Sequence, residues 1–126
     1  MGINRDDLIG KIKNAETIAK RIDEERHNAK SRDKLNKITQ IRLFYDELQK
    51  LQKDAKKLDF KLLVPSIYLV MSKVAYSHGR KLIGEELRKF LQNNIGGIET
   101  KEDLDNFMLY FEAVLGYYRY FNPSES

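Results

Sequence analysis

Cysteine and tryptophan are absent from the 126-residue sequence, and proline occurs only twice. Without cysteine the chain has no disulfides and no thiolate chemistry, which fits a reducing compartment. His27 and His78 are the only histidines, and no third ligand stands at a spacing that would converge with them on a metal ion. Glycine-rich phosphate loops of the Walker type are also missing. The sequence therefore predicts no metal site, no cofactor and no nucleotide cradle.

Long hydrophobic runs are missing as well. No stretch approaches the roughly 20 apolar residues of a membrane span, and the first ten residues lack the apolar run of a signal peptide. We therefore expect a soluble, cytoplasmic protein without membrane contact. Apolar residues make up 41% of the chain and charged residues 33%, a balance that favours one domain with a single core and heavily solvated helices.

Charge is unevenly distributed along the chain. Residues 1–27 have no net charge, residues 28–81 carry +8, and residues 82–126 carry −4. A concentrated positive segment attracts polyanions more strongly than the same charge spread evenly. The middle of the sequence is therefore the candidate binding region, although a solubilising lysine surface would have the same composition.

Apolar residues recur at intervals of three and four along most of the chain, and no stretch alternates with a period of two. This pattern predicts an all-α, compact bundle of about five helices in one domain, 1–126. We expect an N-terminal helix and basic connector over residues 1–34, a helical core over 35–121, and a frayed tail over 122–126. We expect five helices. The first begins at Asn4, the second covers residues 35–59, and the third runs from Pro65 to Ser77. The fourth begins near Arg80, and the fifth extends from a Thr100 cap to residue 121.

The stretch "KVAYSHGRK", residues 73–81, brings together three basic candidate binding residues and a serine. If its helix runs into the next one, Lys73, Ser77, Arg80 and Lys81 form one stripe. In this interpretation Tyr76 bridges core and surface, and Gly79 permits a close passage of two helices. The histidine within it, His78, has no partner that would make it a catalyst.

Three further basic residues complete the predicted RNA-binding set of Lys37, Arg42, Lys73, Arg80, Lys81 and Arg119. Lys37 and Arg42 open the second helix, and Arg119 is a charge among the aromatic residues of "YFEAVLGYYRYF". Arginine pairs with phosphate through two hydrogen bonds and lysine as a mobile charge, so such residues bind a sugar-phosphate backbone without reading its bases. The aromatic residues themselves are expected in the core rather than in a base-stacking platform.

Two other functions remain open at this point. Arg21 and His27 have the Arg-x5-His spacing of a class of all-α ribonucleases, a loose pattern in a chain with 23 basic residues. A helical adaptor whose basic face meets an acidic protein is the second alternative.

Three segments together resemble the small subunit of type III-A CRISPR effector complexes, of the Csm type. They are "ITQIRLFYDELQKL", "YLVMSKVAYSHGRKL" and "LDNFMLYFEAVLGYYRYF", in the order and at the spacing of that family, from about residue 35 to 121. The matching positions are Gln40, Ile41, Arg42, Lys73, Ala75, Tyr76, Gly79, Arg80, Phe111, Glu112, Ala113, Tyr117, Tyr118 and Arg119. The sequence departs from the family at His78 and Gly116, where smaller or alanine residues are usual.

The resemblance implies a non-catalytic subunit with a role in antiviral defence. Several copies would stack along the complex beside other subunits and line the channel that holds guide RNA and its duplex with target RNA. Cleavage would belong to other subunits. In isolation, the hydrophobic third helix and the aromatic last helix could support a homodimer.

Overall fold

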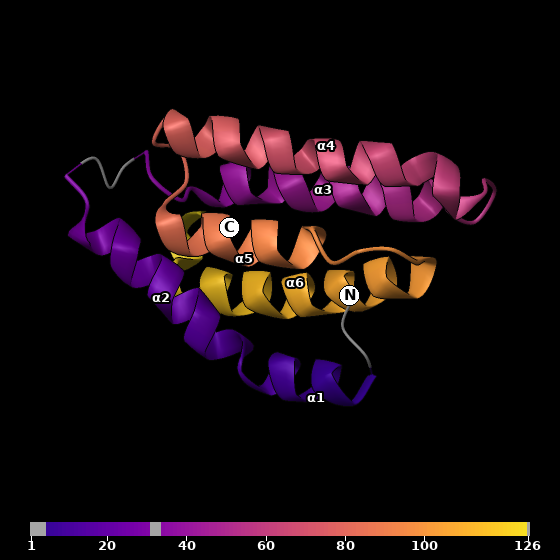
Figure 1. Ribbon diagram of the computed structural model, residues 1–126. Coiled ribbons are helices and arrows are strands. Elements are labelled where there is room, and N and C mark those ends of the chain that lie inside the picture. Colours follow the sequence, from indigo (N-terminus) through magenta and orange to yellow (C-terminus); the bar gives the residue numbers. More distant parts are fainter. Residues whose placement is uncertain (1–4, 31–33, 126) are drawn as a thin grey trace.

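The computed structural model describes residues 5–30 and 34–125, and every regular element within them is helical (Figure 1). The elements are α1 (Arg5–Lys13), α2 (Ala15–Asn28), α3 (Ile38–Asp54), α4 (Phe60–Gly79), α5 (Glu85–Ile95), α6 (Lys101–Phe121) and the 3₁₀ helix η1 (Pro123–Glu125). The all-α prediction is confirmed, with six α-helices among these residues rather than about five.

The additional helix arises because the single N-terminal helix that we expected is divided into α1 and α2. It is interrupted at Asn14, whose backbone N–H is shared between the carbonyls of Gly10, at 3.2 Å, and Lys11, at 3.1 Å. Asparagine disfavours helix interiors because its side chain competes for nearby backbone groups. The predicted cap Asn4 lies outside the described residues.

Helix α4 begins at Phe60, five residues before the start at Pro65 that the sequence predicts. The Asp59 side chain accepts a 3.1 Å hydrogen bond from the Lys61 N–H and caps the helix, which leaves Pro65 inside it. The expectation of a start at Pro65 is therefore wrong, because an aspartate cap precedes the proline. The expected start of the next helix near Arg80 is also wrong, since α5 begins at Glu85 after a turn.

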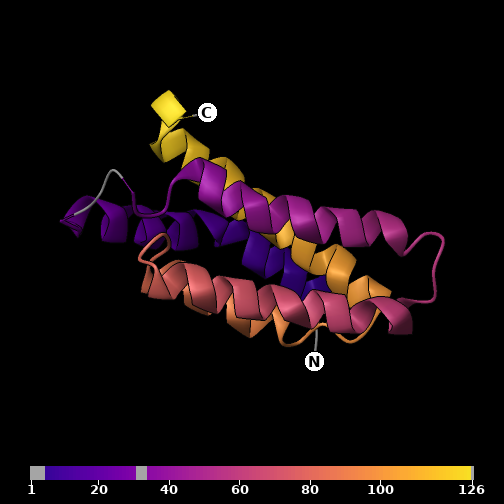
Figure 2. The ribbon, with the colours of Figure 1, turned by 90° about the horizontal axis from the view of Figure 1, so that it is seen from above.

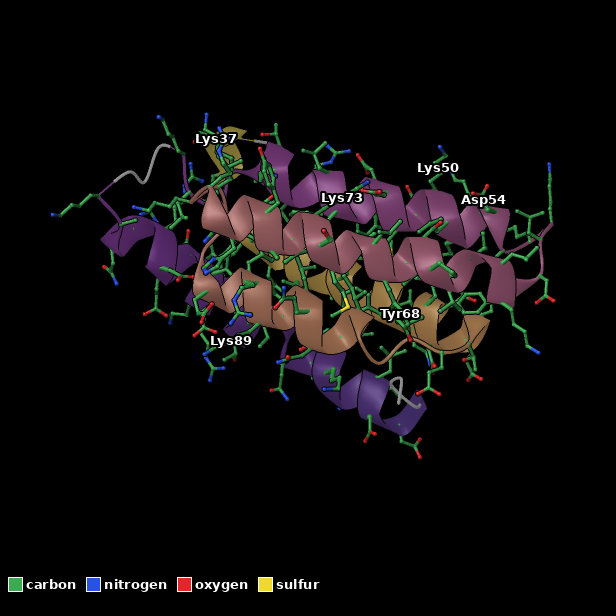
Figure 3. All side chains as sticks on the ribbon, turned by 45° about the horizontal axis from the view of Figure 1, so that its top comes forward. Lys37, Lys50, Asp54, Tyr68, Lys73 and Lys89 are labelled. Carbon is green, nitrogen blue, oxygen red and sulfur yellow. The ribbon has the colours of Figure 1, made fainter. Side chains whose placement is uncertain are left out.

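Helix α6 is the packing centre of the bundle and contacts α1, α2, α3 and α5. Helices α3 and α4 lie side by side and antiparallel in both ribbon views (Figures 1 and 2). Tyr68 ties α4 to the loop before α6 by donating a 2.7 Å hydrogen bond to the Ile98 carbonyl (Figure 3). This arrangement brings the C-terminal ends of α4 and α6 and the N-terminal ends of α3 and α5 to one end of the molecule.

The aromatic residues of α6 supply much of the core, as predicted. Phe107, Phe111 and Tyr118 are fully buried, and Phe90 of α5 makes an edge-to-face contact with Tyr110 at 5.0 Å between ring centres. Such pairs contribute about 0.5–1.5 kcal/mol beyond the area they bury.

One expectation about the end of the chain is wrong. The exposed fractions of Tyr117 and Tyr120 are 38% and 74%, so these two tyrosines lie on the surface rather than in the core. In the tail that we expect to fray, the Asn122 side-chain amide donates a 2.8 Å hydrogen bond to Asp23 of α2, and residues 123–125 form η1.

Thr100 caps α6 as predicted. Its hydroxyl accepts 3.1 Å from the Asp103 N–H, and the Asp103 carboxylate accepts from the Thr100 N–H, which completes a capping box.

Candidate nucleic-acid interface

A fully buried asparagine, Asn36, organises the end of the bundle where the predicted basic residues gather. Its N–H donates to the Leu82 carbonyl at 2.9 Å, and its side-chain amide donates to the Ile22 carbonyl at 3.1 Å. Its side-chain oxygen accepts from the Gly84 N–H at 2.8 Å, and its own carbonyl accepts from the Tyr118 hydroxyl at 2.6 Å. One residue thus joins α2, the start of α3, the α4–α5 turn and α6.

These hydrogen bonds bring three basic residues from distant parts of the sequence to one end of the molecule. Lys37 follows Asn36, Lys81 precedes Leu82, and Arg119 follows Tyr118 in the chain. Lys37 and Lys81 are exposed and Arg119 is half-buried. Together with Arg80 they form a surface that we call the basic end, marked by Lys37 in Figure 3.

The Arg80 guanidinium is held in place by Tyr76. Its Nη1 donates a 2.8 Å hydrogen bond to the Tyr76 hydroxyl, and its carbon lies 5.7 Å from the centre of the ring. Tyr76 is 64% exposed, so the interpretation that it bridges core and surface is wrong. Its surface role was missed, although the Tyr-x3-Arg spacing on a helix could have indicated the pair.

The predicted stripe over residues 73–81 does not form as expected. Helix α4 ends at Gly79, and Lys81 has a positive φ of 60°, which turns the chain away from the helical register. Ser77 is buried, and its hydroxyl accepts a 3.2 Å hydrogen bond from the Gln40 amide of α3. Arg80 and Lys81 nevertheless stay at the basic end, because the Asn36–Leu82 hydrogen bond holds the turn.

Lys73 and Arg42 lie farther along the bundle. Lys73 pairs with Glu47 of α3, so its charge links α3 to α4 and is partly neutralised. Arg42 is exposed on α3, a little more than one turn beyond Lys37. The structure therefore places Lys37, Arg80, Lys81 and Arg119 at the same end of the bundle, and Arg42 and Lys73 farther along α3 and α4.

A family model described as Csm2 Type III-A matches residues 10–124 of this chain. The chain belongs to this family. It is accordingly a small subunit of a type III-A CRISPR effector complex, and the other subunits of that complex are its partners. Comparisons with curated proteins and with solved structures gave no match.

The match extends the resemblance seen in the sequence toward the N-terminus. Segments around the basic end account for much of the resemblance, and α2 packs beneath them. The Csm2-family match thus includes the helix whose Ile22 carbonyl accepts from Asn36 and whose Glu25 carboxylate accepts from the start of α5.

Glu25 fixes the start of α5 in this Csm2-family chain. Its two carboxylate oxygens accept the N–H groups of Glu85, at 2.8 Å, and Glu86, at 3.0 Å. A carboxylate is favoured there because those N–H groups lack partners within the helix and form its positive end. The hydrogen bond from Arg88 then holds the pKa of the neighbouring Glu85 below its usual range, with smaller contributions from the charges of Arg88 and Lys89.

The two histidines, His78 and the His27 of the predicted ribonuclease pair, each lie beside a carboxylate. The His78 ring lies 3.3 Å from the Ile83 carbonyl and 3.6 Å from Glu85, beside an open pocket of ≈ 470 Å³. His27 pairs with Asp23 at 3.2 Å, and six residues of α-helix place Arg21 about 120° away from it around the α2 axis. Over residues 5–30 and 34–125, no group of three acidic or histidine side chains could hold a metal ion.

Gly79 does not allow a close helix passage, since a side chain added there would meet nothing within 4 Å. No helix among the described residues is long and apolar enough to cross a membrane.

Proposed function

We propose that this subunit is a non-catalytic, sequence-independent RNA-binding component of its complex. It contacts the backbone of the guide RNA and of the duplex that the guide forms with target RNA. The observation that carries the proposal is the basic end, where Asn36 gathers Lys37, Lys81 and Arg119 from three parts of the chain.

The chemistry of the basic end favours phosphate over bases. Arg80 presents a fixed guanidinium for two hydrogen bonds to a phosphate, and Lys37 and Lys81 supply mobile charges. An A-form duplex hides its base edges in a deep, narrow groove, so it is recognised through its backbone. Neutralising phosphates releases counterions, and the affinity should therefore fall steeply with salt.

The family supports a structural rather than a catalytic role, since Csm2 is the small subunit of the complex. The Csm2-family match also weighs against the ribonuclease alternative of Arg21 and His27. We place the protein in the cytoplasm with its RNA partners.

Exposed apolar side chains on α4 support contacts with neighbouring subunits and with further copies of the chain. Leu62 and Leu69 are 68% and 61% exposed, and Leu43 of the adjacent α3 is 60% exposed. Large exposed apolar side chains mark protein interfaces where they form a contiguous patch. A homodimer in isolation is the expected consequence when the natural partners are missing.

The test measures binding of two unrelated RNA sequences, single-stranded and paired with a guide, by fluorescence anisotropy at several salt concentrations. Arg80→Glu and Lys81→Glu should weaken binding about tenfold for both sequences. Lys13→Glu, an equal charge change on exposed α1, is the control and should have little effect. Wild-type affinity in both basic-end variants would remove the proposed surface.

A second arm addresses the competing enzyme function. The purified protein is incubated with RNA, and His27→Ala is compared with the wild type. A cutting activity that disappears in His27→Ala would overturn the non-catalytic role.

A further inference from the structure

A second polar hollow lies at the opposite end of α3 from the basic end. It is an open pocket of ≈ 400 Å³, lined by Gln49, Gln52, Lys53, Lys56, Lys101 and Asp105. Its residues come from the last turns of α3, the turn that follows, and the first turn of α6. These segments are about 50 residues apart in the sequence, so the pocket exists only in the folded chain.

The lining has a net positive charge and an unusual shortage of apolar side chains. Three lysines face one carboxylate, that of Asp105. The Asp105 carboxylate is itself engaged, since Oδ1 accepts a 2.8 Å hydrogen bond from the Gln52 amide. The described residues provide no carboxylate within 4.0 Å of the ammonium groups of Lys53, Lys56 or Lys101. Three such lysines around one hollow repel each other, and an anion between them would relieve that repulsion.

The side-chain amides in the lining favour a phosphoryl group as the bound anion over the carboxylates of an acidic partner protein. A phosphoryl group has several acceptor oxygens and can take hydrogen bonds from lysine ammonium groups and from the Gln49 amide together. All six residues that line the pocket are polar or charged, so it lacks the hydrophobic side chains that usually form the centre of a protein interface.

Arg42, one of the predicted RNA-binding residues, lies on the same side of α3 as the pocket. Helical geometry places Arg42, Gln49 and Lys53 within about 40° of one another around the axis, with Arg42 and Lys53 about 16 Å apart along it. Lys50, by contrast, points away from the bundle on the same helix (Figure 3) and does not line the pocket.

We propose that the pocket formed by Lys53, Lys56 and Lys101 binds a phosphoryl group. Resting on the function proposed above, this group is a backbone phosphate of the same RNA that meets the basic end. The RNA then follows α3 from Arg42 to Lys53, and the subunit holds it at two points rather than one. Two weak contacts joined by one strand bind much more tightly than either alone.

The test uses the full-length chain and three charge reversals. Lys53→Glu and Lys101→Glu change the pocket from two different helices, and Lys50→Glu is the matched control on α3. RNA affinity is measured across a salt series. Each pocket variant should lose about tenfold in affinity and lower the slope of log K against log salt by about one, whereas Lys50→Glu should lose less than twofold.

The outcomes separate this inference from the proposed function. If Arg80→Glu weakens binding while Lys53→Glu and Lys101→Glu do not, the pocket inference fails and the basic end stands. If Lys50→Glu lowers RNA affinity as much as Lys53→Glu does, the loss comes from the overall charge of the protein, and the inference also fails.

A second measurement distinguishes RNA from a free anion. Inorganic phosphate is titrated into the labelled protein while amide NMR signals of the pocket residues are followed. Shifts at Lys53 and Lys101 that vanish in Lys53→Glu support a phosphoryl site. If these shifts occur but RNA affinity is unchanged in the pocket variants, the site takes a free phosphoryl ligand and the RNA assignment is wrong. Absence of shifts together with unchanged RNA affinity would remove the site altogether.

Discussion

The Tyr118 hydroxyl donates a 2.6 Å hydrogen bond to the backbone carbonyl of Asn36, which lies 82 residues earlier in the chain. Both residues are buried, so water cannot replace the lost partner of either one. Because Asn36 also holds the α4–α5 turn, this bond connects the last helix to the segment that presents Arg80 and Lys81. The basic end therefore depends on a core hydrogen bond.

Replacing Tyr118 with phenylalanine should destabilise the fold by about 1–3 kcal/mol at neutral pH, the cost of leaving a buried carbonyl without its donor. Urea denaturation followed by circular dichroism measures this loss. RNA affinity should fall in the same variant if the turn loosens.

The same substitution should alter the dependence of stability on pH. Burial raises the pKa of Tyr118 to about 12 in the folded state, above the value of about 10 in an unfolded chain. A raised pKa stabilises the fold fully below the unfolded value, and this contribution is lost as pH rises through the folded value. The stability advantage of wild type over Tyr118→Phe should therefore shrink between about pH 10 and pH 12. An advantage that stays constant across this range would contradict the assignment.

Asn36 can be tested by two substitutions that separate its backbone from its side chain. Its φ of 54° is in the left-handed region, which glycine adopts freely and alanine does not. Both Asn36→Gly and Asn36→Ala remove the hydrogen bonds to Ile22 and Gly84, at a cost of about 2–4 kcal/mol. Asn36→Ala should cost about 1–2 kcal/mol more because of its φ. If chemical denaturation gives the same loss in unfolding free energy for both variants, backbone strain at position 36 does not contribute.

The sequence predicted the helical class, the Thr100 cap and the core face of α6, because these follow from local periodicity and capping chemistry. It could not predict the role of Asn36. A buried polar residue with positive φ is recognisable only when its partners, Ile22, Gly84 and Tyr118, are known, and they lie up to 82 residues away.

The residues of the candidate site could be predicted only in part, because local sequence shows residue type and charge but not distant contacts. Residue type and charge identified Lys37, Arg80, Lys81 and Arg119 as candidates. The assumption of one continuous helix gave Ser77 and Lys81 the wrong positions, because nothing local indicated that Lys81 would adopt a φ of 60°. The pocket around Lys53 and Lys101 was missed because its two halves are distant in the sequence.

Gly84 is expected to accept a side chain only if the Glu25 carboxylate moves away. A methyl group there would lie 2.3 Å from the Glu25 carboxylate, which caps α5. Gly84→Ala should force Glu25 away and cost about 0.5–2 kcal/mol, the usual value of a lost cap. Gly79→Ala, where an added methyl meets nothing within 4 Å, is the matched control and should be neutral or slightly stabilising.

A double-mutant cycle identifies the cause. In a Glu25→Ala background the Gly84→Ala substitution should cost clearly less than in wild type, since the clashing carboxylate is gone. If Gly84→Ala lowers the free energy of unfolding equally in both backgrounds, the cause is the conformation of the α4–α5 turn and not the clash with Glu25.

Leu69 is the test of self-association through α4. Its 61% exposure means that Leu69→Glu should change the free energy of unfolding by less than about 0.5 kcal/mol. If α4 forms a homodimer interface, the variant should be monomeric in light scattering at concentrations where wild type is dimeric. Leu109→Glu on α6, at 51% exposure, serves as the comparison. Dissociation by Leu109→Glu alone would place the interface on α6 instead.

Asp46 is an exposed carboxylate on α3, about 20° from Lys53 around the helix axis and between Arg42 and the pocket. An RNA backbone following this side of α3 would be repelled by it. Asp46→Asn keeps the shape and removes the charge, so RNA affinity should rise about two- to threefold at low salt and the gain should fade as salt increases. Asp6→Asn on α1 makes the same charge change away from the track and should leave affinity unchanged. If both variants gain equally, net charge rather than the path along α3 determines the affinity.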